Sequence, residues 1–429
     1  MYKRQSIDRI DGWLEWRSVE SPLRFSFAAK WQGETVAAGG RIDAPLKLRR
    51  GESSGARINL TTPPADVVFE GTLALADATK FEGTLFADLR APGASLRWLG
   101  FGDLLPLSAK EISLNGTAAG GAGSLSLSEI QLETGGQRFE GSLSFAKVGS
   151  KMSVSGTLAA GMLDIGALMG EPPHFFDASG HWSGEPVIPE PNDALNLDLR
   201  VSASHATWGG YAIDAAAAAL QQRDGCIMLK LIDGTAYQGS LSGEAVIRRS
   251  PNGLEATASG SLANADIGAL VSDWGSSSYS GRGAIEAKLH ASGASAAELA
   301  ASLGGAATMD LQEGAVDGVN FEEALRRSQR RALDVPRDMA IGQTKFASAR
   351  VQLEIRDGQA RILEAQTGGP GAVISAEGAI DIVAREWRTR IHAIQAGAFG
   401  APSVDAARLT LAFVGPWASP TIFALTNSD

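Results

Sequence analysis

In 350-RVQLEIR-356, three apolar residues, Val351, Leu353 and Ile355, alternate with charged or polar residues. Successive side chains of a strand point to opposite faces, so this period of two predicts a strand with one apolar face and one wet face. The same alternation recurs at 197-LDLRVSA-203, 227-IMLKLI-232, 285-IEAKL-289, 387-WRTRIHAI-394 and 408-RLTLAFV-414. Asp-Gly and Asn-Gly pairs at 224–225, 233–234, 252–253, 317–318 and 357–358 separate such segments. Turns of this kind join antiparallel neighbours, which indicates a β-meander.

A glycine-containing strand pattern recurs through the chain. Its copies are 69-FEGTLAL-75, 81-FEGTLFADL-89, 139-FEGSLSF-145, 154-VSGTLAA-160, 233-DGTAYQGSLSGEAVI-247 and 258-ASGSLANADI-267. Glycine and serine keep a strand narrow and let a large sheet bend sharply. We therefore interpret each copy as one strand of a curved wall, with other copies as its neighbours.

Short helices are expected at a few places. Two longer repeats, 155-SGTLAAGMLDIGALMG-170 and 259-SGSLANADIGALVSDWG-275, run from a strand into D-I-G-A-L, where we expect a helical turn; 82-EGTLFADLRAPGASLRWLG-100 is a weaker third copy. Two further helices are predicted at 294-ASAAELAASL-303 and at 320-NFEEALRRSQRRAL-333, the second with Asn320 as N-cap. The predicted fold is mostly β: a long, twisted, curled antiparallel sheet with a few short helices.

Composition excludes several classes of protein. Of the 429 residues, 44% are hydrophobic and only 20% are charged, which argues against disorder. The net charge of −10 disfavours nucleic acid as a partner. Cys226 is the one cysteine, so the chain has neither an internal disulfide nor a thiolate metal cage.

Catalytic and cofactor motifs are scarce. The five histidines show no i, i+4 pair typical of a zinc helix. His174 and His181 share a loop with Asp177 and Glu185, where a metal site is conceivable, but polar loop residues are the better interpretation. The Gly-rich 116-GTAAGGAGS-124 lacks the lysine of a phosphate-binding loop, and G-x-S-x-G is absent. We expect no enzyme activity, no catalytic residue, no metal site and no cofactor.

The apolar face of such a sheet can be covered by a second sheet, by helices or by an apolar ligand. The predicted helices are too few to cover about two dozen short strands. Exposing an acyl chain of sixteen carbons to water costs roughly 12 kcal/mol at about 0.8 kcal/mol per methylene. A lipid is therefore a suitable apolar ligand for this face. A closed β-solenoid or sandwich, acting as an envelope scaffold or adhesin without lipid, is the alternative.

The C-terminal third resembles the AsmA family of Gram-negative envelope proteins. The matching elements, in order, are 304-GGAATMDLQEGAVDGVNFEEALR-326, 342-GQTKFASARVQLEIRDGQAR-361, 373-VISAEGAIDIVAREWRTRI-391 and 411-LAFVGPWASPTI-422. They correspond to a helix entry, a strand pair ending in Asp-Gly, a G-x-[IV]-D-[LI] strand and a closing G-P-W-x-x-P.

The resemblance implies a taco-like β-groove and a non-enzymatic role as a phospholipid conduit in outer-membrane biogenesis. It also implies periplasmic exposure, an inner-membrane anchor through an N-terminal helix that this chain lacks, and contacts with outer-membrane or other envelope proteins. TamB-like and bridge-like lipid-transfer proteins are relatives of the family. The expected modules are residues 1–5 as a non-native scar, 6–170 as the N-terminal part of the groove, 171–193 as a Pro-rich insert or seam, 194–303 as the middle repeats and 304–429 as an AsmA-like C-terminal module. The scar is inferred because 1-MYKRQ-5 is what the transposon-adapter sequence GTGTATAAGAGACAG encodes; a genuine start codon is the alternative.

Individual residues receive three expected roles. The structural motif residues are Gly318, Asn320 and Phe321 at the helix entry, and Gly415, Pro416, Trp417 and Pro420 in a closing turn with an aromatic plug that ends the sheet. The expected groove-lining residues are Val351, Leu353, Ile355, Ile391, Ala393, Leu409, Leu411 and Phe413. Arg326, Arg327, Arg330 and Arg331 share one helix face and are assigned to headgroup or membrane contact. A solvated face balanced by Glu322 and Glu323 is the preferred alternative for these arginines.

Overall fold

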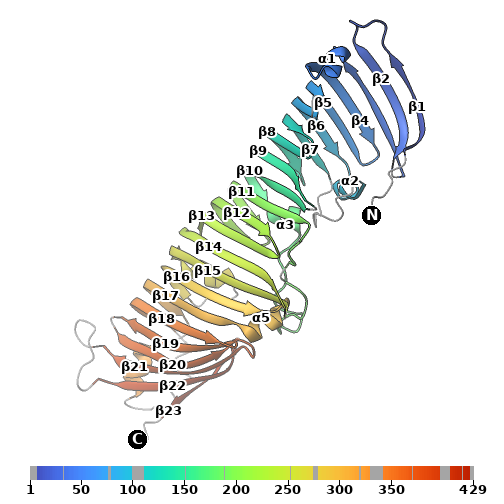
Figure 1. The fold of residues 1–429 in the computed structure, drawn as a ribbon. Coiled ribbons are helices and arrows are strands. Elements are labelled where there is room, and N and C mark those ends of the chain that lie inside the picture. Colours follow the sequence, from blue (N-terminus) through green and yellow to red (C-terminus); the bar gives the residue numbers. More distant parts are fainter. Residues whose placement is uncertain are drawn as a thin grey trace. The chain divides into compact units, whose positions relative to one another are not determined.

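The computed structural model describes residues 7–31, 33–75, 79–98, 111–149, 151–187, 189–251, 253–273, 279–317, 320–328, 342–369, 371–396, 406–417 and 419–425. These residues form two compact units (Figure 1). Unit 1 comprises Met1–Pro172 and Asn192–Gly225, and unit 2 comprises Pro173–Pro191 and Cys226–Asp429. The scar predicted at residues 1–5 lies outside the described residues. The other expected modules remain a prediction, and the units divide the chain at different places.

Unit 1 is a sheet in which sequence neighbours pair antiparallel, with one exception. Its strands are β1 (Ile7–Glu15), β2 (Leu23–Trp31), β3 (Glu34–Ile42), β4 (Ser53–Thr62), β5 (Ala65–Leu75), β6 (Thr79–Leu89), β7 (Ile112–Gly121), β8 (Ser124–Thr134), β9 (Gln137–Val148), β10 (Lys151–Asp164), β11 (Leu195–Trp208) and β12 (Tyr211–Arg223). Its helices are α1 (Pro45–Arg49), α2 (Pro92–Trp98) and α3 (Ile165–Met169). The exception is β10 with β11, which pair parallel.

Unit 2 continues the same construction, and all its described strand pairs are antiparallel. Its strands are β13 (Cys226–Ala236), β14 (Gly239–Ser250), β15 (Gly253–Asp266), β16 (Tyr279–Ser292), β17 (Gly304–Asp317), β18 (Gln343–Arg356), β19 (Gln359–Gly368), β20 (Ala372–Asp381), β21 (Glu386–Gln395), β22 (Arg408–Pro416) and β23 (Thr421–Leu425). Its helices are α4 (Ile267–Asp273), α5 (Ala296–Ser302) and α6 (Phe321–Ser328). The prediction of a mostly β, curled antiparallel sheet with a few short helices is confirmed.

Recurring glycines let neighbouring strands approach closely. The copies 69–75 and 81–89 lie on paired strands β5 and β6, with Gly71 opposite Gly83. A Cβ on Gly71 would lie 2.5 Å from the Cα of Gly83, so a larger residue would force the strands apart. The copies on β9 and β10 also pair with each other, as do those on β14 and β15, where Gly243 faces Gly260. The prediction that copies are neighbouring strands is confirmed for these three pairs.

The expected helical turns also form. Both D-I-G-A-L segments become helices, α3 and α4, and the carboxylates of Asp164 and Asp266 accept the N–H groups of Ala167 and Ala269. The weaker third copy contains α2. Ser295 caps α5 in a capping box with Glu298.

The Pro-rich stretch accounts for the parallel pair. A parallel connection needs a crossover of a dozen or more residues, and α3 together with the chain up to Leu195 supplies it between β10 and β11. The sheet of unit 1 is therefore antiparallel except at this one pair. Helix α1 was also not expected from the sequence; its first residue is Pro45, a residue that favours the first helical turn.

Candidate functional site

The strand register of unit 2 gathers apolar side chains on one face of the sheet. Cross-strand partners on β14 to β18 form three rows, and partners in a row share a face. The first row is Leu241, Leu262, Ile285, Met309 and Val351; the second is Gly243, Gly260, Ala287, Ala307 and Leu353; the third is Ala245, Ala258, Leu289, Gly305 and Ile355. These three rows are called the apolar face of unit 2 below. The second row begins with small residues, so the face is lower there than along the first row.

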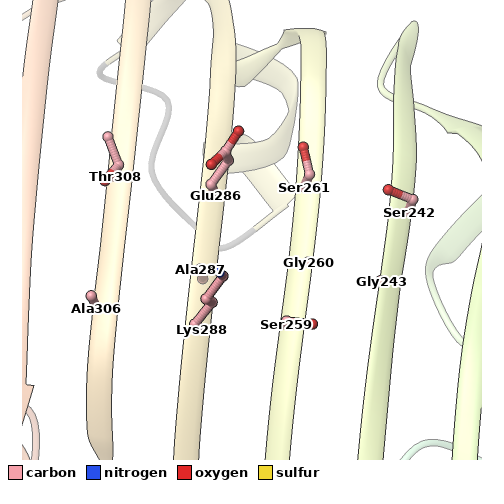
Figure 2. A pocket seen from close by; sticks show the side chains of 10 residues that line it. All are labelled: Ser242, Gly243, Ser259, Gly260, Ser261, Glu286, Ala287, Lys288, Ala306 and Thr308. Atoms are coloured by element: carbon pink, nitrogen blue, oxygen red, sulfur yellow. The ribbon is translucent and has the colours of Figure 1, made fainter.

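The opposite face of the same strands is polar. It carries Ser242, Ser261, Glu286, Thr308 and Gln352 in one cross-strand row, with Lys288 nearby on β16. Figure 2 shows a hollow beside Gly243 and Gly260; its polar lining side chains include Ser242, Ser261, Glu286, Lys288 and Thr308. One face of each strand is thus suited to water and the other to an apolar partner.

Unit 1 repeats this arrangement with larger side chains. Its buried cluster consists of Leu114, Ala118, Leu127, Ile130 and Leu143, and the apolar residues packed against it are Phe81, Leu85, Leu125, Leu132, Phe145, Leu158 and Leu199. These come from strands β6 to β11, so the cluster runs across the strands rather than along one. Ion pairs such as Arg57 with Glu70 and Arg138 with Glu133 lie outside this cluster.

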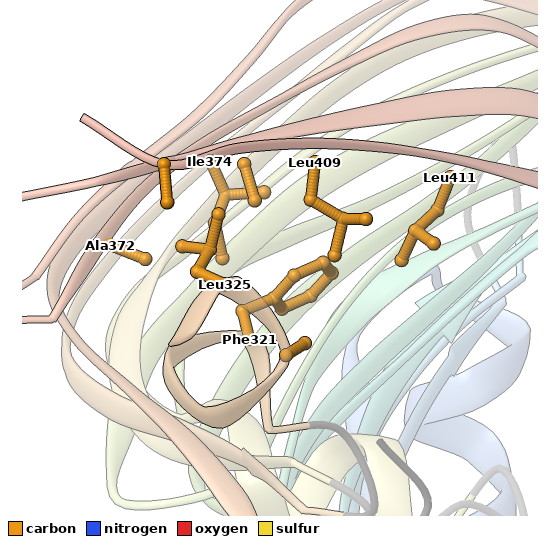
Figure 3. Packing of buried hydrophobic residues seen from close by; sticks show 9 residues of the cluster. Phe321, Leu325, Ala372, Ile374, Leu409 and Leu411 are labelled. Carbon is orange, nitrogen blue, oxygen red and sulfur yellow. The ribbon is translucent and has the colours of Figure 1, made fainter. Parts of the chain in front are cut away.

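Helices cover part of the apolar side of unit 2. Helix α4 brings Ile267 and Leu270 into a cluster with Leu262, Leu311 and Phe346. Helix α6 packs against β21 and β22. Figure 3 shows Phe321 and Leu325 of α6 pointing toward Ile374, Leu409 and Leu411 of the sheet. On the same face, Val351, Leu353 and Leu289 belong to neither of these clusters and are only partly buried. On β13, Leu229, the partner of Ala245, is 50% exposed.

Comparison with known protein families identifies part of this architecture. Residues 177–364 match the model of the AsmA family. This part of the chain belongs to the AsmA family. AsmA-family proteins are envelope proteins. The comparisons with curated proteins and with solved structures returned no match.

The AsmA match overlaps the sequence resemblance without coinciding with it. It contains the elements at 304–326 and 342–361, and it also reaches upstream over the D-I-G-A-L repeat at 259–275. The elements at 373–391 and 411–422 lie beyond its end. The apolar rows of β14 to β18 fall wholly inside the match, whereas the α6-covered strands β20 to β22 fall outside it.

The structure divides the expected groove-lining residues into two groups. Ala393, Leu409 and Leu411 are buried under α6, and Ile391 and Phe413 pack against the same cluster. Val351 and Leu353 lie on the apolar face of unit 2 and are partly buried, and Ile355, farther along β18, is buried. The first group therefore contacts a helix of the same chain, whereas Val351 and Leu353 of the second group stay partly exposed.

The helix α6 carries the expected cap and part of the arginine face. The side chain of Asn320 accepts the N–H of Glu323 at 2.9 Å, which agrees with its predicted role as N-cap. Arg326 and Arg327 both form ion pairs with Glu323 and remain exposed. These pairs are what the solvated-face interpretation expects. Gly318, Arg330 and Arg331 lie outside the described residues.

The closing motif forms a turn, but the sheet continues after it. Gly415 and Pro416 end β22, Trp417 and Pro420 follow in the turn, and β23 then pairs with β22. The sequence interpretation that this turn ends the sheet is therefore wrong. The guanidinium of Arg385 lies 5.5 Å from the Trp417 ring centre and 4.4 Å from that of Phe176. Trp417 thus packs beside the Arg385 guanidinium, and its role as an aromatic plug stays a prediction.

The pKa values of two described residues are shifted by their packing and pairing. Burial raises the pKa of Tyr279 to about 12, and its ring stacks on Phe346 inside the α4 cluster. A hydrogen bond from Arg90 lowers the pKa of Asp66. In the described ranges no three His, Cys, Asp or Glu side chains are placed to hold a metal ion, and no helix is long and apolar enough to cross a membrane.

Proposed function

We propose that this AsmA-family protein binds phospholipid, with acyl chains on the apolar face of unit 2 and headgroups toward water. The observation that carries the proposal is the set of three apolar rows across β14 to β18: the first row packs in part against the α4 cluster, and Val351, Leu353 and Leu289 stay partly exposed. Side chains on the other face of the same strands are polar or charged, so the apolar rows are a feature of one face only.

The energetics favour an acyl chain as the occupant. Each methylene removed from water contributes about 0.8 kcal/mol, and a chain that crosses several strands contacts the rows continuously. The second row offers Gly243, Gly260 and Ala287 as a low floor, with Leu262 and Ile285 standing beside it in the first row. An extended chain lying perpendicular to the strands fits this relief.

In the cell, the protein would act as a non-enzymatic conduit for phospholipid in the periplasm. The family's place in the cell envelope supports it, and diffusion of phospholipid along the face would serve outer-membrane biogenesis. The full-length protein would be anchored in the inner membrane by an N-terminal helix and would meet outer-membrane or other envelope proteins as partners. No covalent chemistry or cofactor is required for such movement.

The alternative, a closed scaffold or adhesin without lipid, requires a second layer over the apolar rows. In the part of unit 2 that the structure describes, each strand pairs with its sequence neighbours, and the groups packed on the apolar side are helices rather than a second sheet. A scaffold of this kind would leave partly exposed leucines without a role.

To test the proposal, the protein is expressed in a Gram-negative host and purified without detergent, because detergent would displace bound lipid. Lipid is then extracted from the purified protein, and phospholipid is quantified by mass spectrometry. We expect phospholipid at a defined ratio to protein, well above that of an unrelated periplasmic protein purified in parallel. Phospholipid no higher than in the parallel control would overturn the proposal.

A further inference from the structure

The segment Pro173–Pro191, called the strap below, belongs to unit 2 although the chain before and after it belongs to unit 1. Its first part is a small hairpin: Phe176 forms a bridge with Trp182, and their ring centres are 4.7 Å apart. The carboxylate of Asp177 accepts the N–H groups of Ser179 and His181, which fixes the turn. Its second part is extended and rich in proline.

The strap is bound at several points along one rim of the unit 2 sheet, where strands end. The carbonyl of Pro191 accepts a hydrogen bond from Arg249 at the end of β14. The N–H of Val187 donates to Ala294, just after β16, at 2.7 Å. The indole N–H of Trp182 donates to the carbonyl of Ile382, just after β20, at 2.8 Å. In Figure 1 the strap is the green trace beside α5.

Arg385 fastens the hairpin part of the strap. It lies in the turn between β20 and β21, donates to the carbonyl of Gly180 and places its guanidinium over the Phe176 ring at 4.4 Å. The same guanidinium lies 5.5 Å from the ring of Trp417, in the turn after β22. One side chain therefore joins the strap to two turns of the rim, by a hydrogen bond and by cation–π contacts with two rings.

The strap joins the end of β16 to the end of β20 by two different kinds of contact. Its backbone lies against the segment after β16, where the carbonyl of Ser183 accepts the N–H of Ala297 and Pro186 forms a bridge with Ser295. The end of β20 is four strand spacings away, or about 19 Å on a flat sheet. The strap is held there by the indole of Trp182 and the guanidinium of Arg385, so these two strand ends cannot move far apart while both sets of contacts hold.

We infer that the strap is a clasp that limits how far the unit 2 sheet can flatten, with Arg385 as its fastening residue. The inference rests on the proposed function for its consequence: by holding the curl of β14 to β22, the strap sets how open the apolar face is to phospholipid. Release of the hairpin from Arg385 opens the face, and refastening narrows it.

The test uses the full chain and two spin labels on the rim, one on the native Cys226 at the start of β13 and one on Ser419→Cys in the turn after β22. Hydrogen exchange of the Val187 and Ser183 amides reports strap attachment, and the distance between labels reports spread of the rim. Arg385→Ala is the releasing variant, Arg385→Lys the conservative one, and Arg390→Ala, an exposed arginine on β21, the matched control.

We expect Arg385→Ala to speed exchange of the strap amides at least tenfold and to lengthen the label distance by about one strand spacing, near 5 Å. Arg390→Ala should change neither quantity, and Arg385→Lys should fall between the two. Unchanged strap exchange in Arg385→Ala would show that Arg385 does not fasten the strap. Faster exchange with an unchanged label distance would show that the strap does not hold the rim.

A second variant keeps the test informative should Arg385→Ala fold poorly. Trp182→Phe keeps an aromatic ring beside Phe176 but removes the indole N–H that donates to Ile382. The label distance should then lengthen while Arg385 stays in place, and an unchanged distance would overturn the inference. Lipid measured on the same samples separates the two proposals: absence of phospholipid from the unaltered chain sinks the proposed function and leaves the distance result standing.

Discussion

Leu353→Asp is the substitution that probes the apolar face most simply. Leu353 lies in the second row, between Ala307 on β17 and Ile362 on β19, and is partly buried. An aspartate at this position has no cross-strand cation to pair with, so its carboxylate stays hydrated. The bound water then occupies the part of the apolar face that an acyl chain would cross. The backbone pairing of β18 does not depend on the leucine side chain.

The expected magnitude follows from the strand spacing. About four methylenes of an extended acyl chain lie over each ~4.8 Å strand spacing. Hydrating the sheet at one strand therefore removes about 3 kcal/mol of binding free energy, at about 0.8 kcal/mol per methylene. A loss of this size weakens binding by roughly 150-fold.

The matched control is Gln352→Asp, which places the same carboxylate on the same strand but on the polar face, beside Thr308. Affinity is measured by titrating each variant with vesicles that contain a fluorescent phosphatidylethanolamine, and urea unfolding verifies that both variants keep the fold. Leu353→Asp should lose about two orders of magnitude in affinity, and Gln352→Asp should bind like the unaltered chain. Equal affinities for the two folded variants would refute the reasoning.

Three further outcomes concern stability. Leu411 is 0% exposed under α6, so Leu411→Ala should lower the free energy of unfolding of unit 2 by about 2–5 kcal/mol in urea titrations, whereas the exposed Val414→Ala on the same strand should change it little. Ser295→Ala removes the capping hydroxyl of α5 and should cost about 1 kcal/mol, seen as faster amide exchange in that helix; unchanged exchange would argue against the cap. The N–H of Ala384 holds the pKa of Asp381 below its usual 3.8, so the stability this carboxylate contributes is present above about pH 4 and is lost as the pH falls through the lower folded value. Asp381→Asn should therefore reduce the fall in the free energy of unfolding as the pH drops below about 4, measured by urea unfolding at a series of pH values. An unchanged pH dependence would contradict this assignment.

The sequence predicted the features that depend on local pattern. Alternation at 350–356 and at 408–414 gave strands with one apolar face, because side-chain direction in a strand follows residue number alone. The glycine copies predicted strand neighbours, because close approach at Gly71 and Gly83 needs glycine on both strands. Asn320 and the D-I-G-A-L turns were predictable from capping chemistry.

The features that the sequence missed depend on contacts between distant residues. Helix α6 carries Phe321 and Leu325 at i and i+4, which signals an apolar stripe but not the strands that receive it. For that reason Leu409 and Leu411 could not be told apart from Leu353 as lining residues. The strap was recognised only as a break in the strand rhythm, since its attachment depends on Arg385, about 200 residues later. Pattern and proline content carry no information on that partner.

The central claim is that phospholipid contacts one face of the sheet, and β18 offers the most direct test. A photo-crosslinking benzophenone residue is placed at each position from 350 to 354 in turn, the protein is irradiated with phospholipid vesicles, and lipid adducts are quantified by mass spectrometry. The account predicts adducts at Val351 and Leu353 and few at Arg350, Gln352 and Glu354, a period of two that matches the strand register. Equal adducts at all five positions, or none at 351 and 353, would contradict it.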